Sequence, residues 1–223
     1  MKILGIDCST RWTNIGVAVD GKIAGEFNMA IGRNQSAELP ALVENILQRT
    51  GLALDSIGAV AVTSGPGYFT GIRVGLSYGC ALAEGLGKKV VVLGSLLALA
   101  APFLSGDRPL IPVIRARKGY VYSSVLSGYI SSVFPVLPSG LRSVGELTQS
   151  INEYGSALVI LDQDKDLLED LRDIEFLNIA RNSIRGGHVA LLGHYLCDQA
   201  VSPTEATGFY LREPDIGKIK STE

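Results

Sequence analysis

Residues 58–75 read GAVAVTSGPGYFTGIRVG, and the order of residue types in this stretch decides the fold. Residues 58–63 are continuously small and apolar, as in a strand that is buried on both faces. Four glycines and a proline follow within the next twelve residues, and helical spacing begins at about Thr70. Strand, glycine turn and helix in this order indicate an α/β unit.

The residues on both sides extend this unit to three strands, a helix, a strand, a helix, a strand and a helix. The three first strands come from KILGIDCS and NIGVAVDGKIAGEFNMA, with Asp20-Gly21 as a hairpin turn. The helices are expected over about Ser36–Arg49, over Thr70–Leu86, and over Ser95–Leu104 with Ser95 as the N-cap. This order is the repeat unit of actin-like ATPases and ribonuclease-H-like proteins. We therefore predict an α/β, actin-like (ASKHA) fold with two lobes.

A change of composition near residues 105–109 suggests where the second lobe begins. A strand pair is expected around Lys118-Gly119, followed by a Pro- and Ser-rich stretch with Pro135 and Pro138. Residues 156–164 read as one more strand and residues 186–200 as a late helix. We predict an N-terminal lobe over residues 1–106 and a smaller, shortened C-terminal lobe over residues 107–223.

Charge and hydropathy restrict the environment and the partners of the chain. Its 20 basic and 22 acidic residues give a net charge of −2 without any basic run, so a nucleic acid is expected only through a partner. The longest apolar run, residues 90–104, is interrupted by Gly94 and Pro102 and is too short for a membrane span. The first strand begins almost at Met1, which argues against a secretory signal. Three cysteines without metal-binding spacing indicate reduced thiols, and we predict a cytoplasmic protein.

The glycine turn does not match either of the common phosphate-binding motifs. A P-loop needs Gly-Lys-Ser/Thr, but Gly71 is followed by Ile72-Arg73. The spacing of Gly65, Gly67 and Gly71 is looser than in a dinucleotide fingerprint, and the next strand, residues 89–94, lacks a terminal acidic residue. Phosphate binding at this turn is therefore disfavoured.

Small residues recur at every fourth position of the second predicted helix and form one stripe. The stripe consists of Gly71, Gly75, Gly79, Ala83 and Gly87. Because each helical glycine costs about 1 kcal/mol relative to alanine, a close approach of another element is expected along it. That element is either the chain's own sheet or a helix of another chain. In the second case Tyr78 and Leu82 would be the natural anchors.

Asp7, at the end of the first strand, is the best single candidate for chemistry. Actin-like ATPases place an aspartate there, facing metal and phosphate. The matching turn of the second lobe offers Arg115 and Arg117 in place of a second acid, and one carboxylate is a weak magnesium site. Asp7 could equally cap the neighbouring turn. A self-sufficient actin-like ATPase or small-molecule kinase that uses Asp7 is the alternative function.

The histidines do not indicate a metal site or a catalytic base. His188 and His194, the only two, are six residues apart and face different sides of a predicted helix. No G-x-S-x-G elbow is present, so a peptidase-like hydrolase, the third possibility, has no identifiable nucleophile–base pair. We predict no catalytic residue and no metal ligand.

Four motifs together resemble the TsaB (YeaZ) family, a bacterial branch of the actin-like superfamily. They are ILGIDCST (residues 3–10), SGPGYFTGIRVG (64–75), ARKGYVY (116–122) and FYLRE (209–213). Their order and spacing match over essentially the whole chain, and the second motif is the most specific. Four positions depart from the family pattern, in which serine, histidine, aspartate and proline are usual: Tyr68, Gln35, Arg115 and Phe209, respectively.

The resemblance implies a non-catalytic subunit that activates a TsaD-like enzyme. With a TsaE-like ATPase, the complex transfers a threonylcarbamoyl group to the adenosine next to the anticodon of tRNAs that read ANN codons. The resemblance also implies that tRNA is met only through the complex. ATP and Mg²⁺ are used by the partners, with no cofactor of the chain's own.

The resemblance further implies that the first two helices form the interface with TsaD, or with a second copy in a homodimer. The corresponding residues are Pro40, Ala41, Glu44, Gly71, Gly75, Tyr78, Gly79 and Leu82. Asp7, Ser9 and Thr10 would be the remnant of a nucleotide site.

Overall fold

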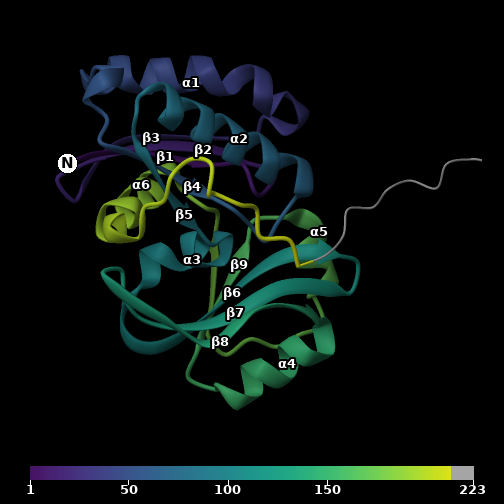
Figure 1. Cartoon of the computed structure of the whole chain (residues 1–223). Helices are drawn as coiled ribbons and strands as arrows, with labels where there is room; N and C mark the ends of the chain where they lie inside the picture. The colour runs from purple at the N-terminus through teal and green to yellow at the C-terminus, as the bar shows by residue number, and fades with distance from the viewer. Residues whose placement is uncertain (212–223) are drawn as a thin grey trace, which may run out of the picture.

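The computed structural model describes residues 1–211 and contains two five-stranded sheets, one in each lobe (Figure 1). The first sheet has the order β3-β2-β1-β4-β5. Its strands are β1 (Lys2–Asp7), β2 (Thr13–Val19), β3 (Lys22–Met29), β4 (Ala59–Thr63) and β5 (Lys89–Leu93). The first three form an antiparallel meander, and β4 and β5 run parallel to β1. The predicted order of elements and the predicted actin-like α/β fold are confirmed.

Helices cover both faces of the first sheet. The helices α1 (Gln35–Thr50) and α2 (Phe69–Gly85) lie on one face, and α6 (Gly186–Tyr195) lies on the other (Figure 1). Glycine permits the close approach of α6. A Cβ on Gly16 would lie 2.2 Å from the backbone of Gly186, and one on Gly5 would lie 2.3 Å from the backbone nitrogen of Ala190. The first lobe, defined as the first sheet with α1, α2 and α6, is therefore assembled from both ends of the chain.

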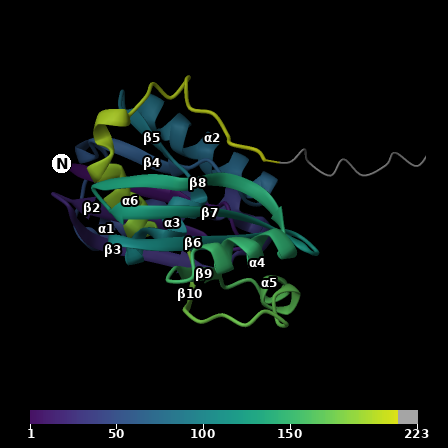
Figure 2. The same cartoon turned by 90° about the horizontal axis from the view of Figure 1, so that it is seen from below.

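The second sheet has the order β10-β9-β6-β7-β8 (Figure 2). Its strands are β6 (Ser105–Arg117), β7 (Tyr120–Tyr129), β8 (Ser132–Ser143), β9 (Leu158–Asp162) and β10 (Ile179–Asn182). The helices α4 (Val144–Glu153) and α5 (Lys165–Asp170) pack on its outer face through Leu147 and Leu167. This sheet with α4 and α5 is the second lobe.

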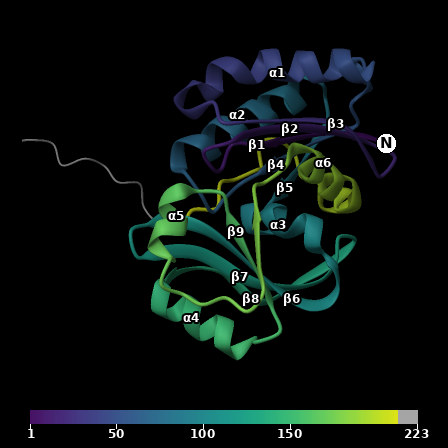
Figure 3. The same cartoon turned by 180° about the vertical axis from the view of Figure 1, so that it is seen from behind.

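One apolar core joins the two lobes. The short helix α3 (Ser95–Ala100) lies between the sheets, with a 3-10 turn (Ala101–Phe103) after it (Figure 3). Its Leu96 and Leu99 share a cluster with Ile3 of the first sheet and Ile160 of the second. The predicted division between residues 106 and 107 stays a prediction, and α6, from the second range, packs on the first sheet.

The predicted N-cap of the third helix is wrong, and one strand was not predicted. Gly94, in extended conformation, is the N-cap of α3, and Ser95 is its first helical residue, without a capping bond from its side chain. The Pro- and Ser-rich stretch is strand β8, which contains both Pro135 and Pro138. Proline is tolerated there because β8 is an edge strand, where a missing N–H interrupts few ladder bonds. Within residues 1–211, no helix is both long enough and apolar enough to cross a membrane.

Candidate partner surface and interlobe cleft

The small residues of α2 face the chain's own sheet. A Cβ on Gly71 would lie 1.9 Å from the carbonyl oxygen of Cys8, and one on Gly79 would lie 2.3 Å from the Val62 side chain. Gly75 is also buried, with Cys8 3.4 Å from its Cβ position. Packing onto the chain's own sheet is thus confirmed for Gly71, Gly75 and Gly79 of the stripe. This packing contradicts the prediction that Gly71, Gly75 and Gly79 belong to a partner surface.

Gly87 has a different role from the rest of the stripe. It lies beyond the last residue of α2, at φ +63°, a left-handed conformation that glycine adopts without strain. Its N–H donates to the Glu84 carbonyl at 3.0 Å, and the next N–H, of Lys88, donates to the Ala83 carbonyl at 2.8 Å. Gly87 therefore terminates the helix.

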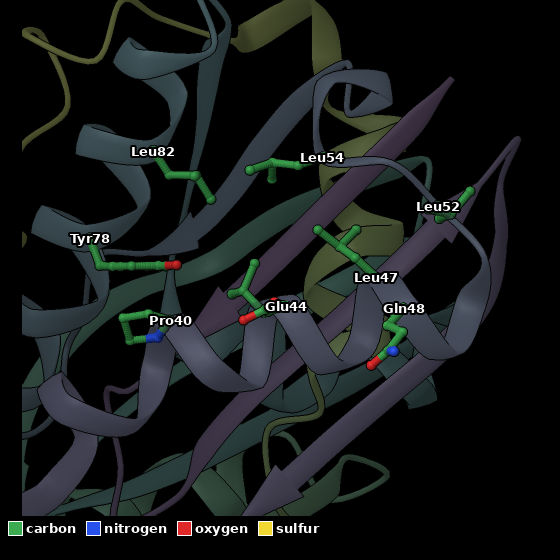
Figure 4. Close-up of a pocket in the computed structure, with 9 residues that line it drawn as sticks. Pro40, Glu44, Leu47, Gln48, Leu52, Leu54, Tyr78 and Leu82 are labelled. Atoms are coloured by element: carbon green, nitrogen blue, oxygen red, sulfur yellow. The ribbon is translucent and has the colours of Figure 1, made fainter.

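On the side that is turned away from the sheet, α1 and α2 border an open groove of about 490 Å³ (Figure 4). Apolar residues from α1, the following loop and α2 line it, with two polar side chains between them. They are Pro40, Val43, Glu44, Leu47, Gln48, Leu52, Leu54, Tyr78 and Leu82. A second hollow of about 460 Å³ adjoins the groove at Tyr78 and extends to Arg73. We refer to the groove and this hollow as the α1–α2 surface.

The structure brings five of the predicted interface residues together at or beside the α1–α2 surface. Pro40 and Glu44 are exposed on α1, and Tyr78 and Leu82 are half-buried on α2. Burial raises the pKa of the Tyr78 hydroxyl. Ala41 is exposed on α1, next to Pro40 in the sequence. Contact of these five residues with a partner stays a prediction.

Asp7 is completely buried, and its carboxylate accepts hydrogen bonds from four donors of the same chain. Oδ1 accepts from the Ser9 backbone N–H at 3.1 Å, from Ser9 Oγ at 2.6 Å and from Thr63 Oγ1 at 2.6 Å. Oδ2 accepts from Asn14 Nδ2 at 2.8 Å. Asp7 therefore caps the turn after β1 and connects it to β2 and β4. Capping of this turn was the alternative to a catalytic role that the sequence left open for Asp7. Thr10 is buried beside this cluster, and its Oγ1 accepts from the Trp12 N–H at 3.3 Å.

Side chains from both lobes meet in a polar cluster close to the turn after β1. Arg11, in the loop after β1, places Nε 2.9 Å from Asp164 Oδ2 and donates through Nη2 to Asp166 Oδ2 at 2.6 Å. The Tyr68 hydroxyl donates to Asp164 Oδ2 at 2.9 Å and accepts from Arg11 Nε at 3.2 Å. Asp164 is the N-cap of α5, and its Oδ1 accepts from the N–H groups of Asp166 and Leu167. Two residues of the first lobe are thus bound to the start of α5 in the second.

Arg115 strengthens the same cluster from within the second lobe. Its Nη1 lies 3.5 Å from Asp166 Oδ2, and its Nε donates to Asp170 Oδ2 at 3.3 Å. Asp166 is therefore contacted by Arg11 and Arg115 from opposite lobes. Tyr68 and Arg115, two of the departures from the family pattern, both belong to this cluster.

Asp162, at the end of β9, is a buried carboxyl group close to this cluster, with a relative exposure of 3%. Burial raises its pKa to about 7, with further contributions from the negative charges of Asp164 and Asp7, while Arg11 acts in the opposite direction. Among the residues that the structure describes, its Oδ1 has no hydrogen-bond partner. Asp162 could not be singled out from the sequence, because a single acid after an apolar strand carries no recognisable signal.

The other two departures have structural roles. Gln35 is buried at the first position of α1 and donates from Nε2 to the Trp12 carbonyl at 3.2 Å. The Phe209 N–H donates to the Ser64 carbonyl at 2.7 Å, so the C-terminal segment covers the glycine turn. Of the FYLRE motif, residues 212 and 213 lie outside the described residues.

The histidines and cysteines are dispersed. Burial lowers the pKa of His188 and raises that of the Cys8 thiol. All three cysteines are free. Between residues 1 and 211, no three His, Cys, Asp or Glu side chains are arranged to hold a metal ion.

Comparisons with known proteins relate the chain to tRNA modification. A model of the family TsaD, tRNA N6-adenosine threonylcarbamoyltransferase, matches residues 29–132. The tRNA threonylcarbamoyladenosine biosynthesis protein TsaB of Bacillus subtilis is 25% identical over 86% of this chain and 87% of its own. TsaB of Escherichia coli is 32% identical over 55% of this chain and about half of its own length, 53%. YeaZ from Pseudomonas aeruginosa has the same fold, with a TM-score of 0.78 at 20% identity over 94% of this chain and 99% of that chain.

Proposed function

Since this chain belongs to the TsaB (YeaZ) family, we propose that it acts in tRNA threonylcarbamoyladenosine biosynthesis as the non-catalytic partner of a TsaD-like transferase. In this proposal the α1–α2 surface binds the transferase subunit, and a TsaE-like ATPase completes the complex. A second copy of the chain occupies the same surface when the transferase is absent. Contact with tRNA is made through the complex, in the cytoplasm.

The α1–α2 surface is the observation that carries this proposal. Its groove combines an aromatic and an aliphatic anchor, Tyr78 and Leu82, with the polar Glu44 and Gln48 at the α1 side (Figure 4). Stable interfaces have this composition, with an apolar centre and a polar rim. Because the small residues of α2 hold its inner face against the sheet, the outer face is presented on a rigid support.

The state of Asp7 supports a non-catalytic role. A carboxylate that binds Mg²⁺ directly presents its oxygens to the ion. Both oxygens of Asp7 are already engaged by Ser9, Asn14 and Thr63, so metal binding would break internal bonds. We therefore propose that ATP and Mg²⁺ are used by the partner subunits and that this chain has no cofactor of its own.

Truncating the two anchors should abolish pairing with the transferase subunit. Buried aromatic anchors contribute at least about 2 kcal/mol each to interfaces, so Tyr78→Ala with Leu82→Ala should raise the Kd by at least about 100-fold. Binding is measured by calorimetry with the purified TsaD-like subunit of the same organism. Threonylcarbamoyl transfer to tRNA, reconstituted with that subunit and the TsaE-like ATPase, should fall in parallel.

A tyrosine elsewhere provides the matched control for this double variant. Tyr129, at the end of β7 in the second lobe, is 56% exposed, and Tyr129→Ala should leave pairing and transfer unchanged. Unchanged affinity in the folded double variant would exclude the α1–α2 surface as the docking site. Full transfer without this chain would exclude the activating role itself.

Calorimetry with Mg-ATP separates the proposal from the alternative of a self-sufficient ATPase or small-molecule kinase. The wild-type chain should give no heat of tight binding, because the Asp7 carboxylate is saturated by internal donors. Tight binding of Mg-ATP that Asp7→Asn removes would instead establish the alternative function.

A further inference from the structure

We propose that Arg11, Tyr68, Asp164, Asp166 and Arg115 form an interlobe latch, which keeps the two lobes closed over a buried acidic pair, Asp7 and Asp162. The latch is a property of the isolated chain and does not depend on the proposed partner. The contacts, burial and charges of these residues support the latch.

The latch contacts are direct and charge-assisted. Arg11 and Tyr68 follow β1 and β4 of the first lobe, and both bind Asp164 Oδ2. The side chain of Asp164 is only 2% exposed, so these bonds are formed in a largely dehydrated environment, where charged hydrogen bonds are strong. In Figures 1 and 3, α5 of the second lobe lies beside one end of α2.

The two acidic groups beneath the latch oppose closure when both are ionised. Asp7 belongs to the first lobe and Asp162 to the second, and both are buried. The charge of Asp7 acts on Asp162 strongly enough to contribute to its raised pKa. Two buried carboxylates repel each other unless one is protonated. The latch contacts lie beside these carboxyl groups and offset this repulsion, in addition to the apolar core that joins the two lobes.

The outer part of the latch is accessible to water. The side chains of Arg11 and Asp166 are 53% and 51% exposed. Exposed ion pairs contribute little to stability and exchange readily with water. Asp164 and the half-buried Tyr68 hydroxyl thus form the buried part of the latch, while the outer Arg11–Asp166 pair can open.

Hydrogen exchange on the full chain tests the latch with Tyr68→Phe, which keeps the ring but removes the hydroxyl, and with Arg11→Ala. The two variants together should accelerate amide exchange at least tenfold in residues 8–12 and 163–168, with unchanged exchange in α1 and α4. Arg172→Ala is the matched control, because Arg172 pairs only with Glu169 and Asp173 of its own lobe among the described contacts. The Arg172→Ala variant should show the same amide exchange rates as the wild type.

A carbon-13 titration of the Asp162 carboxyl gives a second readout that a loss of packing alone would not produce. The titration uses Tyr68→Phe alone, because Arg11→Ala would remove a positive charge that itself lowers the pKa of Asp162. Once the latch is released in this variant, water reaches Asp162, and its pKa should move from about 7 toward 4. Unchanged local exchange and an unchanged pKa would overturn the proposal, as would acceleration that is uniform along the chain. If the double variant does not fold, Tyr68→Phe alone must show the local effect, and its absence there would count equally against the latch.

Discussion

Gly71→Ala is expected to lower the free energy of unfolding by about 3–5 kcal/mol, a large part of the 5–15 kcal/mol typical of a domain. The new methyl group would lie 1.9 Å from the carbonyl oxygen of Cys8, which belongs to the backbone and cannot rotate away. The helix α2 would have to move off the first sheet, so that contacts along the stripe would be lost together. Urea denaturation followed by circular dichroism measures the change.

The same helix contains the control for this substitution. Gly85, the last residue of α2, is exposed, and nothing lies within 4 Å of its Cβ position. Gly85→Ala should therefore be neutral or stabilise the protein by up to about 1 kcal/mol, since alanine favours the helix. If Gly71→Ala changed stability by less than 1 kcal/mol, α2 would not pack on β1 as described.

Asp162→Asn is expected to stabilise the protein strongly at pH 8 and hardly at all at pH 4. The pKa of Asp162 is about 7 in the folded chain and about 3.9 in an unfolded one. Between these values the native state binds more protons than the unfolded state, so stability falls as pH rises. Above pH 7 the ionised, buried Asp162 lowers the free energy of unfolding by its full effect, up to about 4 kcal/mol. Asparagine does not ionise and avoids this cost.

Thermal or urea unfolding at several pH values between 4 and 8 measures the effect. The wild type should lose stability across this window through Asp162, and the variant should lose clearly less. Asp173→Asn is the control, because the Asp173 side chain is 91% exposed. Parallel stability curves for the wild type and Asp162→Asn would show that Asp162 is ionised normally in the folded chain.

The order of elements could be predicted from the sequence because strand and helix periodicities are local. Hairpin residues such as Asp20-Gly21 and the glycine turn mark where elements change, and the structure follows them closely. The strand β8 was missed because Pro135 and Pro138 argue against a strand wherever its place in the sheet is unknown. Only the topology shows that β8 is an edge.

The site was harder to predict because its contacts join distant parts of the chain. The spacing of Gly71, Gly75 and Gly79 is the same whether a sheet or a partner covers the stripe, so the sequence left both possibilities open. Arg11 and Asp166 are 155 residues apart, and neither lies in a pattern that points to the other. Asp7 was recognised from its position after the first strand, but its four internal donors became visible only in the structure.

The return of α6 to the first sheet has a consequence for biosynthesis. While the chain leaves the ribosome, the meander and α1 emerge first, yet the opposite face of their sheet has no cover until residues 186–195 have been synthesised. Nascent β1 and β2 thus expose Gly5, Gly16 and their apolar neighbours until α6 has been synthesised. The first lobe is therefore completed long after its own strands have emerged, and a chaperone can bind to the uncovered face of the sheet during this interval.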